Sequence, residues 1–77
     1  MRVTLLAFAT AAQRLGWRSR EVAAEADDTP LQLFQRADPG FAPGVARAAV
    51  NGTYQDWNAA VGAEAREVAI IPPVSGG

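Results

Sequence analysis

Apolar residues gather in a few short runs along the chain, and the first run predicts a strand followed by a short helix. Residues 3–9 are nearly all apolar, which is typical of a strand covered on both faces. Residues 10–15 (TAAQRL) favour one or two helical turns, and Gly16 stands where a helix usually ends in a left-handed residue. Residues 21–24 (EVAA) predict a second strand that pairs with the first.

The stretch 27–30 (DDTP) predicts the start of the main helix. Thr29 is a good N-cap, and Pro30 suits the first helical position because its missing N–H costs nothing there. The apolar side chains that follow at helical spacing are expected to face the core: Leu31, Leu33 and Phe34. Residues 38–40 (DPG) end this helix, and Phe41 is expected to tuck under the loop that follows.

A hairpin is predicted after the main helix. Residues 45–50 (VARAAV) alternate as a strand does, and residues 51–52 (NG) are a strong hairpin signal because both tolerate a positive φ. Residues 53–57 (TYQDW) predict the return strand. Its side chains are expected on opposite faces, Tyr54 and Asp56 on one and Trp57 on the other.

The last strand is predicted at residues 67–71 (EVAII), after a connecting segment over residues 58–66. Its β-branched residues suit the centre of a sheet. Pro72 and Pro73 must end it, because neither can donate a ladder hydrogen bond.

This order of elements indicates an α+β domain with one mixed sheet and one main helix across it. The first and last strands are the most apolar, so we expect them to be parallel neighbours at the centre. A right-handed crossover through the helix satisfies the chirality rule. This is the ubiquitin-like β-grasp arrangement, predicted over residues 1–71, with residues 72–77 as an extended, flexible Gly-Gly tail.

The charged and nucleophilic residues that are missing exclude several classes of protein. All seven cations are Arg, against eight acidic residues, so the net charge of −1 argues against nucleic-acid binding. The chain has no His, Cys or Lys, which excludes a zinc finger, a disulfide framework and the commonest catalytic bases and nucleophiles. We therefore expect no metal site, no stably bound cofactor and no enzyme active on its own.

No apolar run approaches the length of a membrane span, so no membrane partner and a cytoplasmic location are expected. One alternative is a secretory signal peptide. Residues 1–12 resemble a basic start, an apolar stretch and A-x-A cleavage sites such as residues 7–9 (AFA). A buried first strand is favoured, because cleavage would remove large apolar side chains that a small core needs.

The C-terminal residues 70–77 (IIPPVSGG) indicate a reactive chain end. They leave a buried strand, are stiffened by two prolines and finish in two glycines, which remove all side-chain bulk from the terminal carboxylate. Six residues from Pro72 reach roughly 20 Å. This design suits threading a carboxylate into a narrow pocket of another protein.

The chain resembles the small subunit of molybdopterin synthase, a ubiquitin-like sulfur carrier of the MoaD/ThiS type. The likeness is most specific at residues 67–77 (EVAIIPPVSGG), which are similar to that family's ending. Residues 49–51 (AVN) and 5–9 (LLAFA), with residues 15–16 (LG), resemble its hairpin, first strand and first helix.

The resemblance implies a mechanism. A separate adenylating enzyme (MoeB type) activates the terminal carboxylate with ATP, and sulfur then replaces the adenylate to give a thiocarboxylate. The tail enters the large synthase subunit (MoaE type), which transfers the sulfur to cyclic pyranopterin monophosphate. Two transfers make the dithiolene of molybdopterin, the organic part of the molybdenum cofactor. A heterotetramer with the large subunit is implied.

The same resemblance assigns roles to individual residues. Gly77 would carry the adenylate and then the sulfur. The inserted tail would comprise Pro73, Val74, Ser75 and Gly76, and Phe8 matches an apolar docking position. Phe8 reads equally well as plain packing.

Other functions remain open at this point. A thiamine-type carrier shares the fold and the Gly-Gly but usually lacks the Pro-Pro-Val, and carriers for cysteine synthesis or tRNA thiolation are further alternatives. A protein modifier that conjugates through Gly77 is a competing class, as is a plain interaction module. A basic patch of Arg14, Arg18 and Arg20 near Trp17 is a further candidate, with a solvated face as the simpler interpretation.

Overall fold

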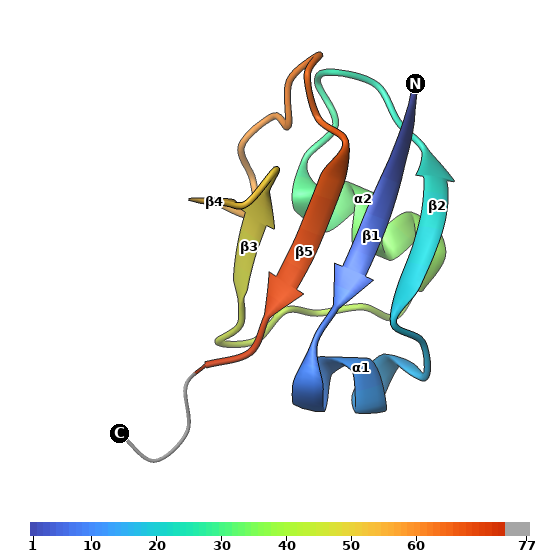
Figure 1. Ribbon diagram of the computed structural model, residues 1–77, viewed down its shortest axis with the longest axis vertical. Coiled ribbons are helices and arrows are strands. Elements are labelled where there is room, and N and C mark those ends of the chain that lie inside the picture. Colours follow the sequence, from blue (N-terminus) through green and yellow to red (C-terminus); the bar gives the residue numbers. More distant parts are fainter. Residues whose placement is uncertain (74–77) are drawn as a thin grey trace.

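A computed structural model describes residues 1–73 of the chain, which form a five-stranded sheet and two helices (Figure 1). The elements in chain order are β1 (Arg2–Ala7), α1 (Ala9–Leu15), β2 (Ser19–Ala23), α2 (Pro30–Ala37), β3 (Arg47–Val50), β4 (Thr53–Gln55) and β5 (Glu67–Ile71). The predicted order of strands and helices is therefore confirmed, and the bounds of the last strand agree with the prediction.

The sheet has the strand order β2-β1-β5-β3-β4, with β1 parallel to β5 and every other pair antiparallel. The first and last strands are thus the parallel central neighbours that their apolar content predicts. Figure 1 shows α2 packed across one face of this sheet and α1 at the end of the sheet where β1 and β5 finish. This is the predicted β-grasp fold with a mixed sheet.

The main helix, α2, begins where the sequence predicts because its first turn is doubly capped. The Thr29 hydroxyl accepts a hydrogen bond from the Gln32 N–H at 3.1 Å, and the Gln32 side chain accepts one from the Thr29 N–H at 2.9 Å. Pro30 occupies the first turn, where no N–H is needed. Such capping fixes the start of a helix that is only eight residues long.

Phe34 forms the centre of the core beneath the sheet. Its ring lies 5.0 Å from Phe41, 5.7 Å from Trp57 and 6.0 Å from Trp17, between ring centroids. Phe34 and Leu33 are fully buried and Phe41 nearly so, as predicted, whereas Leu31 is only half-buried. The four rings hold α2, the loop after it, the segment after β4 and the turn before β2 against one another.

The end of β1 and the start of α1 differ from the prediction by two residues and by one residue, respectively. The strand ends at Ala7 rather than at residue 9, and the helix begins at Ala9 rather than at residue 10. Ala9 adopts a positive φ of 50°, which no strand residue does. The helix ends as predicted at Gly16, whose φ is 84° and whose N–H donates to the Ala12 carbonyl.

The strand β2 also begins earlier than residue 21, because its ladder forms directly after the turn. The Arg18 carbonyl already accepts a hydrogen bond from the Ala7 N–H at 2.9 Å, and Ser19 pairs with Leu6. Weak strand propensity in the short EVAA stretch is therefore overruled by pairing with a strongly apolar neighbour.

Both strands of the predicted hairpin are shorter than expected, although its turn is confirmed by the positive φ of Asn51 and Gly52. A turn at Gly44, with a φ of 59°, keeps Val45 out of β3 and leaves it 80% exposed. The side chain of Asp56 accepts a hydrogen bond from the Asn58 N–H, and this turn ends β4 at Gln55.

The predicted strand positions of Asp56 and Trp57 are therefore wrong. Trp57 instead turns toward the core, where its indole N–H donates to the Ala46 carbonyl at 2.9 Å. Within residues 1–73, no helix has the length and apolar character needed to cross a bilayer.

Candidate functional site

The root of the tail is held at the middle of the sheet. The strand β5 has β1 on one side and β3 on the other, and its residues Val68 and Ile70 are buried. Ile71 still pairs with Arg47, and the chain then leaves the sheet at half-buried Pro72 and exposed Pro73. Because both neighbours hold the strand, the tail starts from a fixed point (Figure 1).

Most of the predicted tail residues, Val74, Ser75, Gly76 and Gly77, lie outside the described part of the chain. Pro73 is the last described residue, and it is exposed at the point where the tail departs. The roles of residues 73–77 in adenylation, sulfur attachment and insertion therefore remain predictions.

The side chain of Asn51 fixes the other end of β5. Its amide N–H donates to the Glu64 carbonyl at 2.8 Å, and its oxygen accepts from the Arg66 N–H at 2.8 Å and the Glu67 N–H at 3.1 Å. The hairpin turn is thereby joined to the loop that leads into β5. Sequence reasoning assigned Asn51 only to the turn, because these partners are 13 to 16 residues away.

The sheet face opposite α2 carries a row of apolar side chains in register. Leu6, Ala69, Ala49 and Tyr54 pair in turn across β1, β5, β3 and β4. The neighbours of Leu6 and Ala69 along their strands belong to the core instead, because side chains alternate along a strand. Among residues 1–73, no helix covers the side of the sheet nearer the viewer in Figure 1.

The two ends of this row, Leu6 and Tyr54, carry larger side chains than the two alanines between them. Ala49 and Ala69 are only 3% and 8% exposed although no helix covers them, whereas Tyr54 is 57% exposed. The Arg47 guanidinium lies 4.5 Å from the centre of the Tyr54 ring. The accessible apolar surface of this row is therefore supplied by half-buried Leu6 and exposed Tyr54, at its two ends.

Phe8, the predicted docking residue, lies at the end of the sheet from which the tail leaves. It follows β1 directly, caps α1 with an extended backbone and is 49% exposed. Alternation along the chain puts its side chain on the side of Leu6, one position beyond the pair of Ala7 with Ile70. This placement leaves Phe8 accessible beside the tail, and its docking role remains a prediction.

The three arginines proposed as one basic patch have different surroundings. The Arg20 guanidinium carbon lies 5.4 Å from the centre of the Trp17 ring. The same side chain donates a hydrogen bond of 3.4 Å to the carbonyl of Ala37, the last residue of α2. Arg18 is exposed. Arg14 lines a groove beside the tail root.

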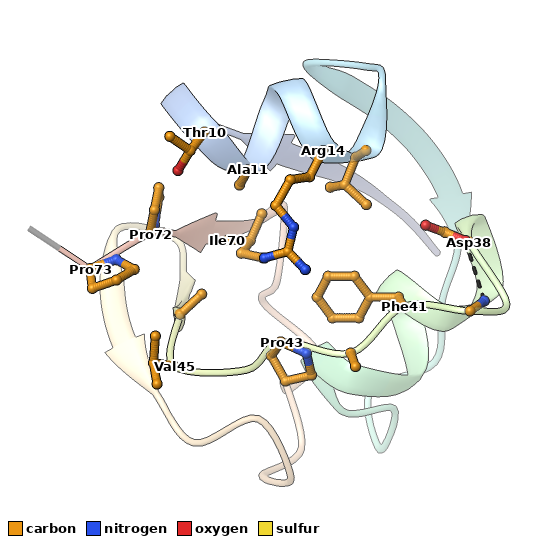
Figure 2. A pocket seen from close by; sticks show the side chains of 14 residues that line it. Thr10, Ala11, Arg14, Asp38, Phe41, Pro43, Val45, Ile70, Pro72 and Pro73 are labelled. Atoms are coloured by element: carbon orange, nitrogen blue, oxygen red, sulfur yellow. Dashed lines mark hydrogen bonds between the residues drawn. The ribbon is translucent and has the colours of Figure 1, made fainter. Parts of the chain in front are cut away.

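This groove, the tail-root groove, has a volume of about 170 Å³ and is shown in Figure 2. One wall is α1, the other is the loop between α2 and β3, and Pro72 and Pro73 lie at one end. The walls come from segments far apart in the sequence. No local motif could therefore have pointed to it.

A single ion pair among the described residues perturbs a carboxyl group, and it lies away from the tail. The hydrogen bond from Arg36 at 3.0 Å, helped by one from the Glu25 N–H, holds the pKa of Asp28 below its ordinary value. The same bond raises the pKa of Arg36. Residues 1–73 contain no group of three or more acidic residues placed to hold a metal ion together.

Comparison with known proteins agrees with this geometry. The structure is similar to that of SAMP1 from Haloferax volcanii, with a TM-score of 0.74, 26% identity and 100% of both chains covered. A second structure, of small archaeal modifier protein 1 from H. volcanii, gives a TM-score of 0.69 and 23% identity over 95% of this chain and 98% of that one.

A protein assigned as molybdopterin converting factor, subunit 1, from Pyrococcus furiosus shares the fold. Its TM-score is 0.61 and its identity 19%, over 96% of this chain and 99% of that one. The comparison with curated proteins gives no significant match. The model of the ThiS family matches residues 5–77, which include both the sheet and the Gly-Gly ending. The chain therefore belongs to the ThiS family of small ubiquitin-like sulfur carriers.

Proposed function

We propose that this chain carries sulfur on its C-terminal carboxylate. The observation that supports the proposal best is the course of β5, a strand held between β1 and β3 that runs directly into Pro72 and Pro73. Only four residues follow, and the last two are glycines. A buried strand thus holds one end of a short, narrow segment whose other end is the reactive carboxylate.

The chemistry requires no side chain of this protein. A partner enzyme transfers AMP from ATP to the Gly77 carboxylate and releases pyrophosphate. A sulfide nucleophile then attacks the carbonyl carbon; the new C–S bond replaces the C–O bond to AMP, and the products are a thiocarboxylate, AMP and a proton. ATP and the catalytic groups belong to the activating enzyme, so the chain binds no cofactor stably and is not an enzyme on its own.

The acceptor we propose is cyclic pyranopterin monophosphate, bound by the large subunit of molybdopterin synthase. The Pro-Pro-Val before the ending supports this choice over a thiamine-type carrier. The accessible apolar side chains of Leu6, Tyr54 and Phe8 would contact this partner. Two carriers and two large subunits would form the working heterotetramer.

A second candidate is a protein modifier, and the likeness to SAMP1 favours it because it spans the whole of both chains. Here the activated Gly77 carbonyl would be attacked by a lysine amine of another protein. The chain has no Lys of its own, so it cannot form isopeptide-linked chains on itself.

Intact-mass measurement tests the sulfur chemistry. The protein is incubated with the adenylating enzyme, ATP and a sulfide donor, and we expect one terminal oxygen to be replaced by sulfur. Deleting Gly77 or adding a residue after it should abolish this change while the circular dichroism spectrum stays the same. An unchanged mass for the intact chain would refute the proposal.

The acceptor is tested separately with the loaded carrier. Mixing it with the large synthase subunit and cyclic pyranopterin monophosphate should give a dithiolene product and return the carrier to its free acid. Higher-mass conjugates in cells, together with no dithiolene product, would favour the modifier instead.

A further inference from the structure

The tail-root groove is too small for a nucleotide or a pterin. Its volume of about 170 Å³ lies below the range of about 300–1,000 Å³ typical of small-molecule sites. Ile70, Phe41 and Pro43 contribute apolar surface to its lining. Any group that enters this groove must therefore be narrow.

Arg14 gives the groove a positive charge. Figure 2 shows its guanidinium pointing over the groove, between Ile70 and Phe41. Among residues 1–73, Arg14 forms no ion pair, and its side chain donates none of the hydrogen bonds found there. A guanidinium has the fork geometry that matches a carboxylate or a phosphate, and of these two groups the carboxylate is the smaller, which suits a narrow groove.

The other charged residue of the groove, Asp38, lies away from the tail. Figure 2 places it beyond Phe41, at the end opposite Pro73. One of its carboxylate oxygens accepts a hydrogen bond from the Gly40 N–H at 3.3 Å. An incoming anion therefore meets Arg14 before it approaches Asp38.

The chain's own C-terminus fits this groove in length, shape and charge. Pro73 lines the groove, and four residues follow it, which reach at most about 13 Å. Gly76 and Gly77 lack side chains and tolerate positive φ, so they can turn back and enter a narrow space. The terminal carboxylate supplies a negative charge to pair with Arg14.

We propose that the tail-root groove is a carboxylate-binding site for the chain's own C-terminus, with the Gly77 carboxylate on the guanidinium of Arg14. The carboxylate is held there until the activating enzyme draws the tail out. The site concerns the unmodified acid, so it holds whether or not Gly77 later accepts sulfur. A partner's apolar side chain fits less well, because it would leave Arg14 without an anion.

Nuclear magnetic resonance on the full chain tests this site directly. We expect cross-relaxation between the Cα protons of Gly76 or Gly77 and the Phe41 ring. The Arg14 Nε–H signal should shift as the pH falls from about 6 to about 2.5, where terminal carboxyls titrate. Raising the salt to about 1 M should weaken both signals, because the Debye length falls to about 3 Å.

Two arginine variants separate the charge at this site from a general effect of charge. Arg14→Gln should lower the population of the docked tail by up to about fivefold, the range expected for an exposed ion pair. Arg18→Gln removes the same charge from an exposed position outside the groove lining and should leave the contacts intact. A chain with a C-terminal amide should behave as Arg14→Gln does.

Three outcomes would overturn the proposal. The first is an intact chain whose two terminal glycines show no contact with the groove. The second is a docked tail that survives Arg14→Gln unchanged. The third is a groove whose signals change only when a partner protein is added, which would identify that partner as the occupant. Normal sulfur loading alongside any of these results would leave the sulfur-carrier function intact.

Discussion

The most informative single substitution is at Asn51, because one side chain there joins the hairpin turn to the loop that leads into β5. Asn51→Ala removes three hydrogen bonds, those to Glu64, Arg66 and Glu67, and puts alanine at a φ of 50°. Alanine is poorly tolerated in that left-handed region, whereas asparagine and glycine are accepted.

The expected loss of stability follows from these contacts. A neutral hydrogen bond contributes about 0.5–1.5 kcal/mol net, and a value of about 0.7 kcal/mol applies here because Asn51 is exposed and water can replace its bonds. Three such bonds give about 2 kcal/mol, and the left-handed backbone costs alanine about 1 kcal/mol more. We therefore expect Asn51→Ala to lower the free energy of unfolding by about 3 kcal/mol.

Two matched variants divide this loss into its parts. Asn51→Gly loses the bonds but suits the backbone, so it should cost about 2 kcal/mol. Asn51→Asp keeps the acceptor oxygen for both N–H groups, but it replaces the donor to Glu64 with an oxygen that repels the Glu64 carbonyl, so it should cost about 1 kcal/mol.

Urea unfolding followed by circular dichroism measures all three variants, with an unchanged m-value as the sign that the unfolded state is the same. The order of stability should be wild type, then aspartate, then glycine, then alanine. An alanine variant within about 0.5 kcal/mol of wild type, or a glycine variant less stable than the alanine one, would refute this account of Asn51.

Three further predictions concern stability and docking. Arg36 lowers the pKa of Asp28 in the folded protein, so the stability that this ion pair contributes is complete above the ordinary pKa of 3.8 and is lost as the pH falls through the lower folded pKa. In urea unfolding, Arg36→Gln should therefore lose less stability in acid than the wild type does, and an identical pH profile would contradict this. Phe34→Ala should lower the free energy of unfolding by about 3–5 kcal/mol, a large part of the total of about 4–12 kcal/mol expected for this length. A loss below about 1.5 kcal/mol in the same assay would show instead that the other aromatic rings move in to fill the cavity. Phe8→Ser should change stability by less than about 0.5 kcal/mol yet weaken calorimetric binding to the large synthase subunit at least about tenfold; equal affinity would remove Phe8 from the docking surface.

The parts of the fold that the sequence predicts well are those with strong local signals. Thr29 and Pro30 determine the start of α2 through contacts within one turn, and residues 51–52 determine the hairpin turn through their own backbone preferences. The parallel pairing of β1 with β5 is a long-range feature, yet it follows from the two most apolar strands seeking the centre of the sheet.

The mistakes arise where a side chain finds a partner elsewhere in the fold. Trp57 continues an alternating pattern, but β4 ends at the turn of Asp56 and Asn58, and beyond it the Trp57 ring joins the cluster around Phe34 while its indole N–H donates to Ala46. Arg14 illustrates the same limit for the candidate site. Nothing near it in the sequence indicates that the loop between α2 and β3 lies across from it.

The position of β5 also has a mechanical consequence. A pull on the C-terminal end of β5 that is directed along the strand loads β5 along its own length. The hydrogen bonds to β1 and β3 then bear the load together, in shear, instead of opening one after another. A strand held on both sides resists traction in that direction, which is what the proposed insertion of the tail into a partner would require.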